Sequence, residues 1–393
     1  MTTDWEHFFY KVENSSILAF EGDESHALKN NVSFFHKLTG IDLPSYDIAV
    51  IGVCDARNSY NKSCSKAPDQ IRKSLYGLVN FPRNINILDL GNLKGKTIND
   101  KYQLLEDIVY DLMGCNVMPV VIGGSQDYTL PLARAVKRHK RFYRLAVVDS
   151  KVDWVRPDMD FSSTGYLGLL CEEDRSVPED LSIVGCQKYY VSANQFDQLR
   201  SHSFDFLRLG EIKQKGIKTV EPWMRDADLI SFDINAIRQS DLPVRFESAP
   251  NGFFADEACQ IAWYAGLSDQ LKVFGLFELG IGDQEDCFNP MVAAQVLWHL
   301  WEGYSSRCKD YPVKEIEDYR QYIVHLDEYG IDMKFYNNPD NDRWWVEVPG
   351  MDSNVIIACD RNDFELASGR EIPDKWFRFL RKMNCKSMGN KYS

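Results

Sequence analysis

Short apolar runs alternate with longer amphipathic segments along most of the chain. The runs are rich in Val, Ile and Leu without polar alternation, which indicates strands buried on both faces of a sheet. They cover residues 47–54, 85–90, 117–124, 145–150, 181–187, 204–209, 227–235 and 273–280. Helices are predicted over residues 67–78, 99–114, 130–139, 255–267 and 290–304. Strands separated by helices predict an α/β fold of three layers, with a parallel sheet between two layers of helices.

The pattern changes after about residue 305. A helix is predicted over residues 314–327, then strands over 332–336, 343–348 and 354–359, and a last helix over 373–383. We therefore expect a main domain over residues 1–305, whose first 45 residues form an extra helical segment, and a small α+β module with an antiparallel sheet over residues 306–393.

Aromatic residues cluster in the C-terminal module and are expected to form its core. Adjacent residues of a strand face opposite ways, so either Trp344 or Trp345 is expected to be partly exposed. The cluster comprises Phe335, Tyr336, Trp344, Trp345, Trp376, Phe377 and Phe379.

Composition narrows the class of protein. The formal net charge is −13, which disfavours binding to nucleic acid. No apolar run approaches the roughly 20 residues that span a membrane, and the first residues do not resemble a targeting signal. Ten cysteines are scattered without C-x-x-C pairs, as in reduced proteins. We expect a cytoplasmic protein with no nucleic-acid or membrane partner.

Polar residues follow four of the predicted strands. They are the segments 123–127 (GGSQD), 149–153 (DSKVD) and 233–235 (DIN), and the single residue Glu278. Ligand sites of parallel sheets lie beyond the carboxyl ends of the strands, so these residues are expected to converge. Carboxylates gathered at one edge repel one another and need a cation, which a divalent metal or a lysine ammonium supplies. The structural alternative is that each Asp or Asn only caps the following helix.

These segments resemble, in order and spacing, the motifs of the arginase superfamily, which includes arginase, agmatinase and formimidoylglutamase. The family's G-G-D-H-S, D-A-H-x-D, S-x-D-x-D and late Glu correspond to GGSQD, DSKVD, SFDIN and FELG. The segments 51–75 and 248–253 resemble further family loops, so the resemblance covers about residues 45–304. The stretch from Ala67-Pro68 to Ile71-Arg72 points to the formimidoylglutamase type.

The resemblance implies an altered metal site. In the family, two His and four Asp hold two manganese ions, which generate the hydroxide that attacks the substrate. The retained ligands are Asp149, Asp153 and Asp233, whereas the replaced ligands are Gln126, Lys151 and Asn235. Amides are weak ligands for manganese, and an ammonium cannot ligate a metal at all. Two bound metals are therefore not expected.

Two residues carry the candidate chemistry. Glu278 matches the family residue that faces the cationic group of the substrate, and Arg156 is the second candidate for substrate binding. Glu278 and Lys151 are the catalytic candidates, although nearby carboxylates raise the pKa of a lysine and oppose a role as a base. We expect the Lys151 ammonium to lie where the family holds a metal, as a covalently attached cation.

Two functions follow from the resemblance. The first is a formimidoylglutamase-like protein without a cofactor, which has lost two-manganese hydrolysis and binds or scaffolds a protein partner through its C-terminal module. The alternative is a hydrolase of a linear amidine, of the formimidoylglutamase or agmatinase type, with manganese or one weakly bound divalent cation at an altered site. A homo-oligomer is compatible with both.

Overall fold

A ten-stranded sheet forms the centre of the main domain. The computed structural model describes residues 5–12, 26–37, 40–81, 83, 85–154, 162–202, 204–246, 249–282, 288–312, 318–350 and 354–389. The strands are β1 Phe9–Tyr10, β2 Val32–Phe34, β3 Ile48–Gly52, β4 Ile87–Leu93, β5 Met118–Ile122, β6 Arg144–Val148, β7 Asp180–Cys186, β8 Asp205–Arg208, β9 Leu229–Asp233 and β10 Val273–Phe277. Their order is β1-β4-β3-β5-β10-β9-β6-β7-β8, with β2 also paired to β4.

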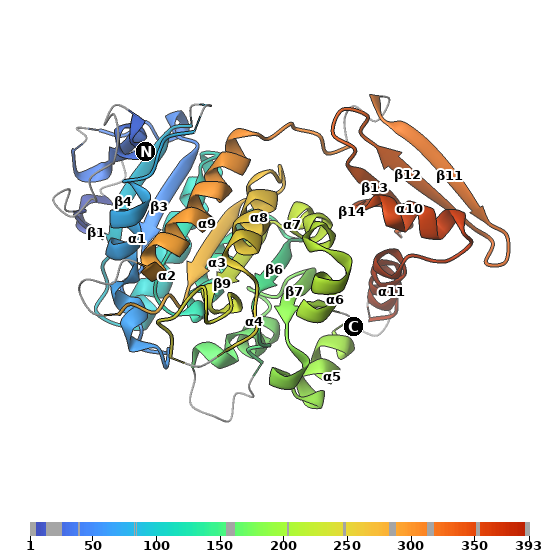
Figure 1. The fold of residues 1–393 in the computed structure, drawn as a ribbon, viewed down its shortest axis with the longest axis horizontal. Helices are drawn as coiled ribbons and strands as arrows, with labels where there is room; N and C mark the ends of the chain where they lie inside the picture. The colour runs from blue at the N-terminus through green and yellow to red at the C-terminus, as the bar shows by residue number, and fades with distance from the viewer. Residues whose placement is uncertain are drawn as a thin grey trace.

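Helices cover both faces of this sheet, as the sequence predicts (Figure 1). One face packs against α1 Ala67–Leu75, α6 Leu209–Lys215, α7 Glu221–Asp226, α8 Ala255–Gly266 and α9 Phe288–Ser305. The other face packs against α2 Ile98–Gly114, α3 Thr129–His139, α4 Tyr166–Glu172 and α5 Ala193–Ser201. Every strand from β3 to β10 runs parallel to its neighbours among them, which confirms the predicted α/β class with a parallel sheet.

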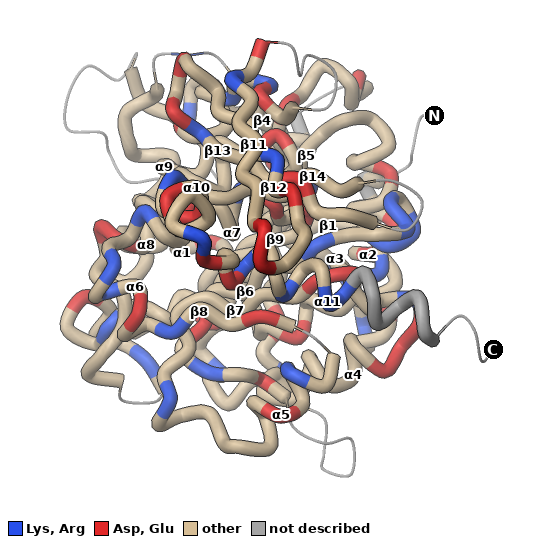
Figure 2. The backbone as a smooth tube through the Cα atoms, turned by 90° about the vertical axis from the view of Figure 1, so that its right-hand side faces the viewer, with Lys and Arg blue, Asp and Glu red and all other residues tan. Residues whose placement is uncertain are grey.

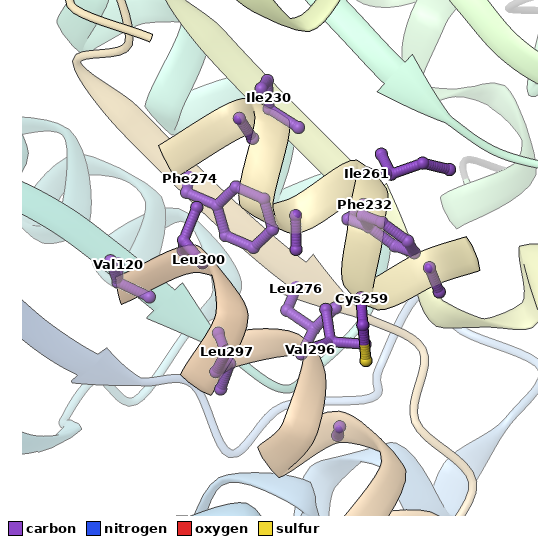
Figure 3. Packing of buried hydrophobic residues seen from close by; sticks show 14 of the residues in the cluster. Val120, Ile230, Phe232, Cys259, Ile261, Phe274, Leu276, Val296, Leu297 and Leu300 are labelled. Carbon is purple, nitrogen blue, oxygen red and sulfur yellow. The ribbon is translucent and has the colours of Figure 1, made fainter. Parts of the chain in front are cut away.

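Apolar side chains fill the space between the sheet and each helical layer. Figure 3 shows Phe232 of β9 beside Ile261 of α8, and Phe274 of β10 beside Leu300 of α9. Residues next to each other along a strand enter opposite clusters: Val50 lies in one and Ile51 in the other. This explains the continuous apolar runs, because both faces of each central strand are buried.

The C-terminal module holds a separate antiparallel sheet (Figure 1). Its strands are β11 Arg320–Leu326, β12 Ile331–Asn337, β13 Trp344–Val348 and β14 Val355–Cys359, paired in that order. Its helices α10 Arg361–Ser368 and α11 Asp374–Gly389 contribute Phe364, Ala367, Trp376 and Phe379 to the cluster on one face of the sheet.

The helix predicted over residues 314–327 is wrong where the structure describes it. Residues 320–326 form β11 instead, and residues 313–317 lie outside the described residues. Tyr322, Val324 and Leu326 alternate toward the apolar cluster of the module, which is the two-residue period of a strand. The charged residues ahead of them suggested a helix, but pairing of β11 with β12 along its whole length determines its structure. Helix α10 was not predicted; Asp360 caps it.

The extra segment expected at the N-terminus is only partly described, since residues 13–25 lie outside the described residues. The described part forms short 3-10 turns and the strands β1 and β2, both of which pair with β4. Hydrogen bonding to the edge strand β4 stabilises the segment, which therefore extends the sheet rather than adding to a helical layer.

Two predictions about aromatic exposure are wrong. Trp344 and Trp345 are 6% and 0% exposed, because the module's helices cover one face of its sheet and the main domain covers part of the other. Trp344 stacks on Phe364, whereas the Trp345 ring lies 4.3 Å from the Arg225 guanidinium of α7. Phe377, predicted to be buried, is exposed on α11. The remaining aromatic residues of the predicted cluster are buried.

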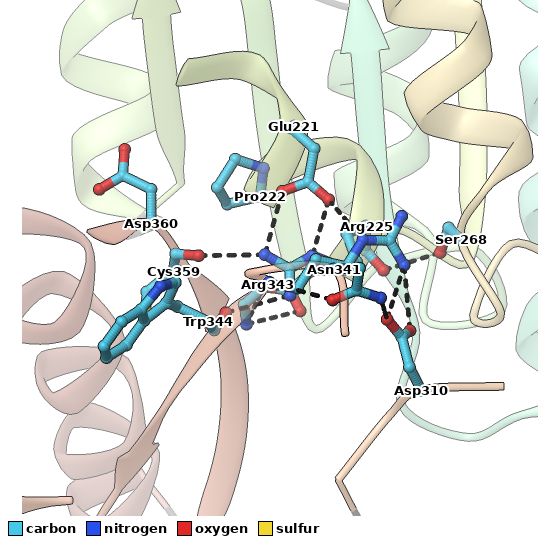
Figure 4. A network of polar contacts seen from close by, with 12 residues as sticks. Glu221, Pro222, Arg225, Ser268, Asp310, Asn341, Arg343, Trp344, Cys359 and Asp360 are labelled. Atoms are coloured by element: carbon cyan, nitrogen blue, oxygen red, sulfur yellow. Dashed lines mark hydrogen bonds and ion pairs between the residues drawn. The ribbon is translucent and has the colours of Figure 1, made fainter. Parts of the chain in front are cut away.

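The module docks at the amino ends of the sheet strands. Figure 4 shows Arg225 donating hydrogen bonds to the carbonyl oxygens of Trp344 and Cys359, both at 3.0 Å. Arg343 pairs with Asp310 at 3.0 Å in the same network. On α11, Lys382 is buried between Asp180 and Asp205, the first residues of β7 and β8. These contacts fix the module at the edge opposite to the predicted site.

No helix among the described residues has the length and apolarity needed to cross a bilayer. Seen from the module's side, Lys and Arg are interspersed with Asp and Glu along the chain (Figure 2).

Candidate functional site

Four neighbouring strands bring the predicted site residues to one edge of the sheet. The strands β5, β10, β9 and β6 are adjacent in that order. Gln126, Glu278, Asp233 and Asp149 lie at or just after their carboxyl ends. Because the four strands are parallel, these segments meet at a single edge of the sheet. Gln126 and Glu278, for example, are hydrogen-bonded although 152 residues separate them in the sequence.

A small cavity of about 70 Å³ lies at this edge. Its lining includes six of the predicted site residues: Asp149, Lys151, Asp153, Asp233, Asn235 and Glu278. Pockets for small molecules usually have volumes of about 300–1,000 Å³, and one water takes up about 30 Å³ of liquid. The cavity therefore has the size of a cation or a few waters, not of an amino-acid substrate.

Glu278 is held firmly at the end of β10. Its backbone lies in the left-handed region at φ 64°, where non-glycine residues are uncommon, and its N–H donates to Gly124 O at 3.0 Å. Its carboxylate accepts hydrogen bonds from Ser59 Oγ at 2.6 Å and from the Gln126 backbone N–H at 3.0 Å. Both carboxylate oxygens thus have partners within the protein, which fixes the orientation of the side chain.

Gln126 is buried behind the cavity rather than in its lining. Its Nε2 donates to Ser231 Oγ at 3.3 Å, and its Oε1 has no partner within the described part of the chain. The preceding glycines hold this turn, because a Cβ at Gly123 would lie 2.5 Å from the Pro68 ring. The side chain that stands at the family's first histidine is therefore engaged with the interior of the sheet.

Asp149 and Asp233 are held by the same local geometry. Asp149 Oδ1 accepts from the Lys151 backbone N–H at 2.9 Å, and Asp233 Oδ1 accepts from the Asn235 N–H at 2.7 Å. Asn235 also donates through Nδ2 to Glu278 O at 3.1 Å. One oxygen of each aspartate thus stabilises the turn after its strand. This agrees in part with the structural alternative, in which the aspartates only cap the following segment.

The carboxylates of the cavity destabilise one another's charged forms. Burial, then the charges of Asp153 and Asp233, raise the pKa of Asp149 well above its usual value. Burial raises the pKa of Asp233 to about 6. Burial and the charge of Asp233 raise the pKa of Glu278 to about 8. The hydrogen bonds and positive charges around these acids therefore do not offset the cost of burying their negative charges together.

Two cations of the chain itself line the cavity. Lys151 is half-buried, its Nζ lies 5.7 Å from the centre of the Tyr190 ring, and its charge lowers the pKa of Asp149 and Asp233. Arg245 also lowers the pKa of Asp233, and it donates to Asn235 O at 2.6 Å. Among the residues that the structure describes, the lining thus combines four carboxyl groups with two basic side chains.

Sequence reasoning missed Arg245, Ser59 and Asn61. Asn61 Nδ2 donates to Glu278 O at 3.0 Å, so the loop after β3 supports the end of β10. These residues lie on loops and outside the strand-end motifs, so only the folded chain brings them to the site. Arg156 was predicted to bind substrate; it lies outside the described residues, and its role stays a prediction.

The donor set does not fit a pair of manganese ions. Gln126 is engaged with Ser231, Lys151 is a cation, and Asn235 supplies a neutral amide. Among the described residues, no group of three or more His, Cys, Asp or Glu side chains is arranged to hold a metal ion.

Comparison with known proteins agrees with this geometry. The sequence matches the model of the family described as "Arginase family" over residues 46–300. It is 23% identical over 222 residues to a guanidinobutyrase from Pseudomonas aeruginosa, covering 51% of this chain and 69% of that protein.

Two solved structures share the fold. A Trypanosoma cruzi formiminoglutamase with Mn²⁺ has a TM-score of 0.63 and 24% identity, over 69% of this chain and 97% of that one. A formimidoylglutamase from Bacillus subtilis has a TM-score of 0.62 and 20% identity, over 74% and 95%. At this identity the likeness shows the fold.

Proposed function

Because this chain belongs to the arginase family, we propose that it is a formimidoylglutamase-like member that has lost two-manganese hydrolysis. In this proposal the conserved fold serves as a binding or scaffolding protein, and the acidic edge is stabilised by the chain's own cations. The fold remains informative about ancestry, but function depends on the residues of the site.

Lys151 is the observation that carries the proposal. Its position corresponds to a metal-binding histidine of the family, and it lines the cavity together with Asp149, Asp153 and Asp233. An ammonium at this place repels a divalent cation and attracts carboxylates. In this proposal the positive charge of Lys151 replaces the charge of the metal that other members of the family bind at this place.

The other two replaced ligands support the same interpretation. Gln126 Nε2 donates a hydrogen bond to Ser231 Oγ, and Asn235 Nδ2 donates one to the Glu278 carbonyl oxygen. Each amide can offer a metal only its neutral oxygen, which is a weak ligand for manganese. Arg245 adds a second positive charge to the lining.

The C-terminal module is the proposed contact surface for a protein partner. It is attached at the amino ends of the strands, so its outer surface and the acidic cavity lie at opposite edges of the sheet. Ile323, Tyr329 and Phe377 are apolar residues exposed on it. We place the protein in the cytoplasm, in keeping with the free thiols of the eight cysteines whose surroundings are described.

One observation favours a second candidate, an amidine hydrolase with a single cation. Asn235 lines the cavity, and its buried Oδ1 has no partner within the described part of the chain. An unpartnered acceptor beside three aspartates suits one weakly held cation. This candidate requires Lys151 to turn away from the carboxylates when the cation binds.

Metal analysis combined with an activity assay tests the proposal. The purified protein is dialysed against excess manganese and offered formiminoglutamate, guanidinobutyrate, agmatine and arginine. We expect less than one manganese per chain and no product above a protein-free control. Two equivalents of manganese with turnover of any of these substrates would overturn the proposal, and one equivalent with turnover would establish the second candidate instead.

A further inference from the structure

A second and larger cleft lies beside the acidic cavity. It has a volume of about 570 Å³, within the range of about 300–1,000 Å³ usual for small-molecule sites. The turn after β7, the start of α6 and the loop over residues 250–254 enclose it. Tyr189 belongs to this cleft and Tyr190 to the acidic cavity, so a single turn separates the two.

The charge of this cleft is opposite to that of the whole chain. Its lining contains four basic side chains and one carboxylate, although the chain has a net charge of −13. The basic residues are Lys188, Arg208, Lys213 and Arg238, and the acid is Glu211. Clustered basic side chains in a concave site raise the local concentration of anions.

Carboxylates behind the wall hold two of these cations in place. Lys213 pairs with Glu257, and Arg238 pairs with Asp241 at 2.8 Å. Neither Glu257 nor Asp241 belongs to the lining of the cleft. Within the lining itself Arg208 pairs with Glu211, so Lys188 is the basic residue of the cleft for which no ion pair is present among the described residues.

Aromatic rings complete the wall. Lys213 Nζ lies 3.6 Å and Arg238 Cζ 4.0 Å from the centre of the Phe254 ring. Tyr189 is 64% exposed, and its hydroxyl donates to Gln187 and accepts from Asn251 Nδ2 at 3.1 Å. These hydrogen bonds fix the Tyr189 ring at the cleft, where it offers a surface on which a flat ligand can stack.

We propose that this cleft binds a phosphorylated small molecule of nucleotide size. Lys188 contacts the phosphate, and Arg208 joins it by exchanging its Glu211 partner for phosphate oxygens, because Lys and Arg are the usual partners of these oxygens. A planar ring of the ligand stacks on Tyr189. The inference uses none of the residues of the acidic cavity, so it stands or falls independently of the loss of metal-dependent hydrolysis.

Glycines give a clean way to test this cleft. A Cβ at Gly210, which lines the cleft, meets nothing within 4 Å, and the same holds for Gly114 at the end of α2. Gly210→Phe therefore fills the cleft without a clash in the fold, whereas Gly114→Phe places the same side chain far from it. Lys188→Glu reverses a charge of the wall, and Lys218→Glu reverses an exposed charge outside it.

Calorimetric titration of the full-length protein with AMP measures the binding directly. We expect AMP to bind, Gly210→Phe to abolish binding, and Lys188→Glu to weaken it by at least about tenfold. Gly114→Phe and Lys218→Glu should bind like the wild type.

Inorganic phosphate and malonate serve as comparison ligands. Tighter binding of AMP than of either one supports the stacked ring, whereas equal binding of phosphate and AMP overturns that part of the proposal. The site is wrong if AMP does not bind at about 1 mM, or if Gly210→Phe binds it as the wild type does.

Discussion

The two edges of the main sheet differ in how many cations accompany their buried carboxylates. At the amino edge, Asp226 pairs with Lys375 at 2.9 Å and Asp228 with Lys140 at 2.8 Å, while Asp180 and Asp205 share Lys382. At the carboxyl edge, Asp149, Asp153, Asp233 and Glu278 gather around one cavity with two basic residues.

The pKa values follow this difference only at Asp180. Burial raises its pKa, but Lys382, Arg144 and Lys375 together leave it below its usual value, whereas burial still raises the pKa of Asp205 beside the same lysine. Burial and neighbouring acids instead raise the pKa of Asp149 and Glu278. A carboxylate matched to a cation stabilises the fold, whereas unmatched carboxylates mark a place that held a cation or still attracts one.

Removing the C-terminal module should have the largest effect at the amino edge. A chain ending at residue 305 lacks the module's ion-pair partners of Asp180 and Asp205 and the carbonyl acceptors of Arg225, which keeps Glu221, and it exposes apolar surface. We expect it to aggregate, as measured by light scattering. A chain ending at residue 389 keeps the described contacts and is the control; a soluble truncated protein with an unchanged melting temperature would contradict the docking described here.

Lys382→Met should be the most damaging single substitution. It removes the ion pair of Asp180 and one of the two ion pairs of Asp205, which keeps Arg378 at 3.3 Å, at a cost of about 3–5 kcal/mol. Denaturant unfolding measures the change in the free energy of unfolding. Arg381→Met, at an exposed neighbour on the same helix, should change it by less than about 0.5 kcal/mol. Equal effects of the two substitutions would show that the buried pairs do not matter.

Lys151→Met should have a smaller effect at the carboxyl edge. Lys151 is only half-buried, and the acids near it can take up protons, so we expect a loss of about 1–3 kcal/mol at pH 7.5. The loss should shrink below pH 6, where Asp233, with a pKa of about 6, becomes protonated. Lys218→Met is the matched exposed control. An unchanged stability at both pH values would refute the idea that Lys151 replaces a bound cation.

Glu278→Gln should change the pH dependence of stability. Between its unfolded pKa of about 4.3 and its folded pKa of about 8, the folded protein binds more protons than the unfolded chain. Stability therefore falls as pH rises through this range, by up to about 1.4 kcal/mol per pH unit. The variant should show a flatter curve than the wild type, and the exposed Glu371→Gln should not. A steeper curve for Glu278→Gln would contradict the raised pKa.

The sequence predicts those parts of the fold where local pattern and tertiary burial agree. The apolar runs of β3 and β5 to β10 and the family motifs place Asp149, Asp233 and Glu278 at one edge, because strand ends are visible in the sequence. Residues 320–326 were predicted as part of a helix, whereas hairpin pairing with β12 along their whole length makes them the strand β11. Arg245 reaches the cavity from a loop, and no periodicity signals such a position.

The central claim is that Gln126, Lys151 and Asn235 abolish the two-manganese site that the rest of the edge still resembles. The most direct test compares melting temperatures with and without manganese, for the wild type and for the triple variant Gln126→His, Lys151→His and Asn235→Asp. A ligand present at 100 times its Kd stabilises by about 2.7 kcal/mol, which raises the melting temperature of a protein of this size by several degrees. We expect that gain in the triple variant and none in the wild type; a manganese-dependent gain in the wild type would contradict the claim.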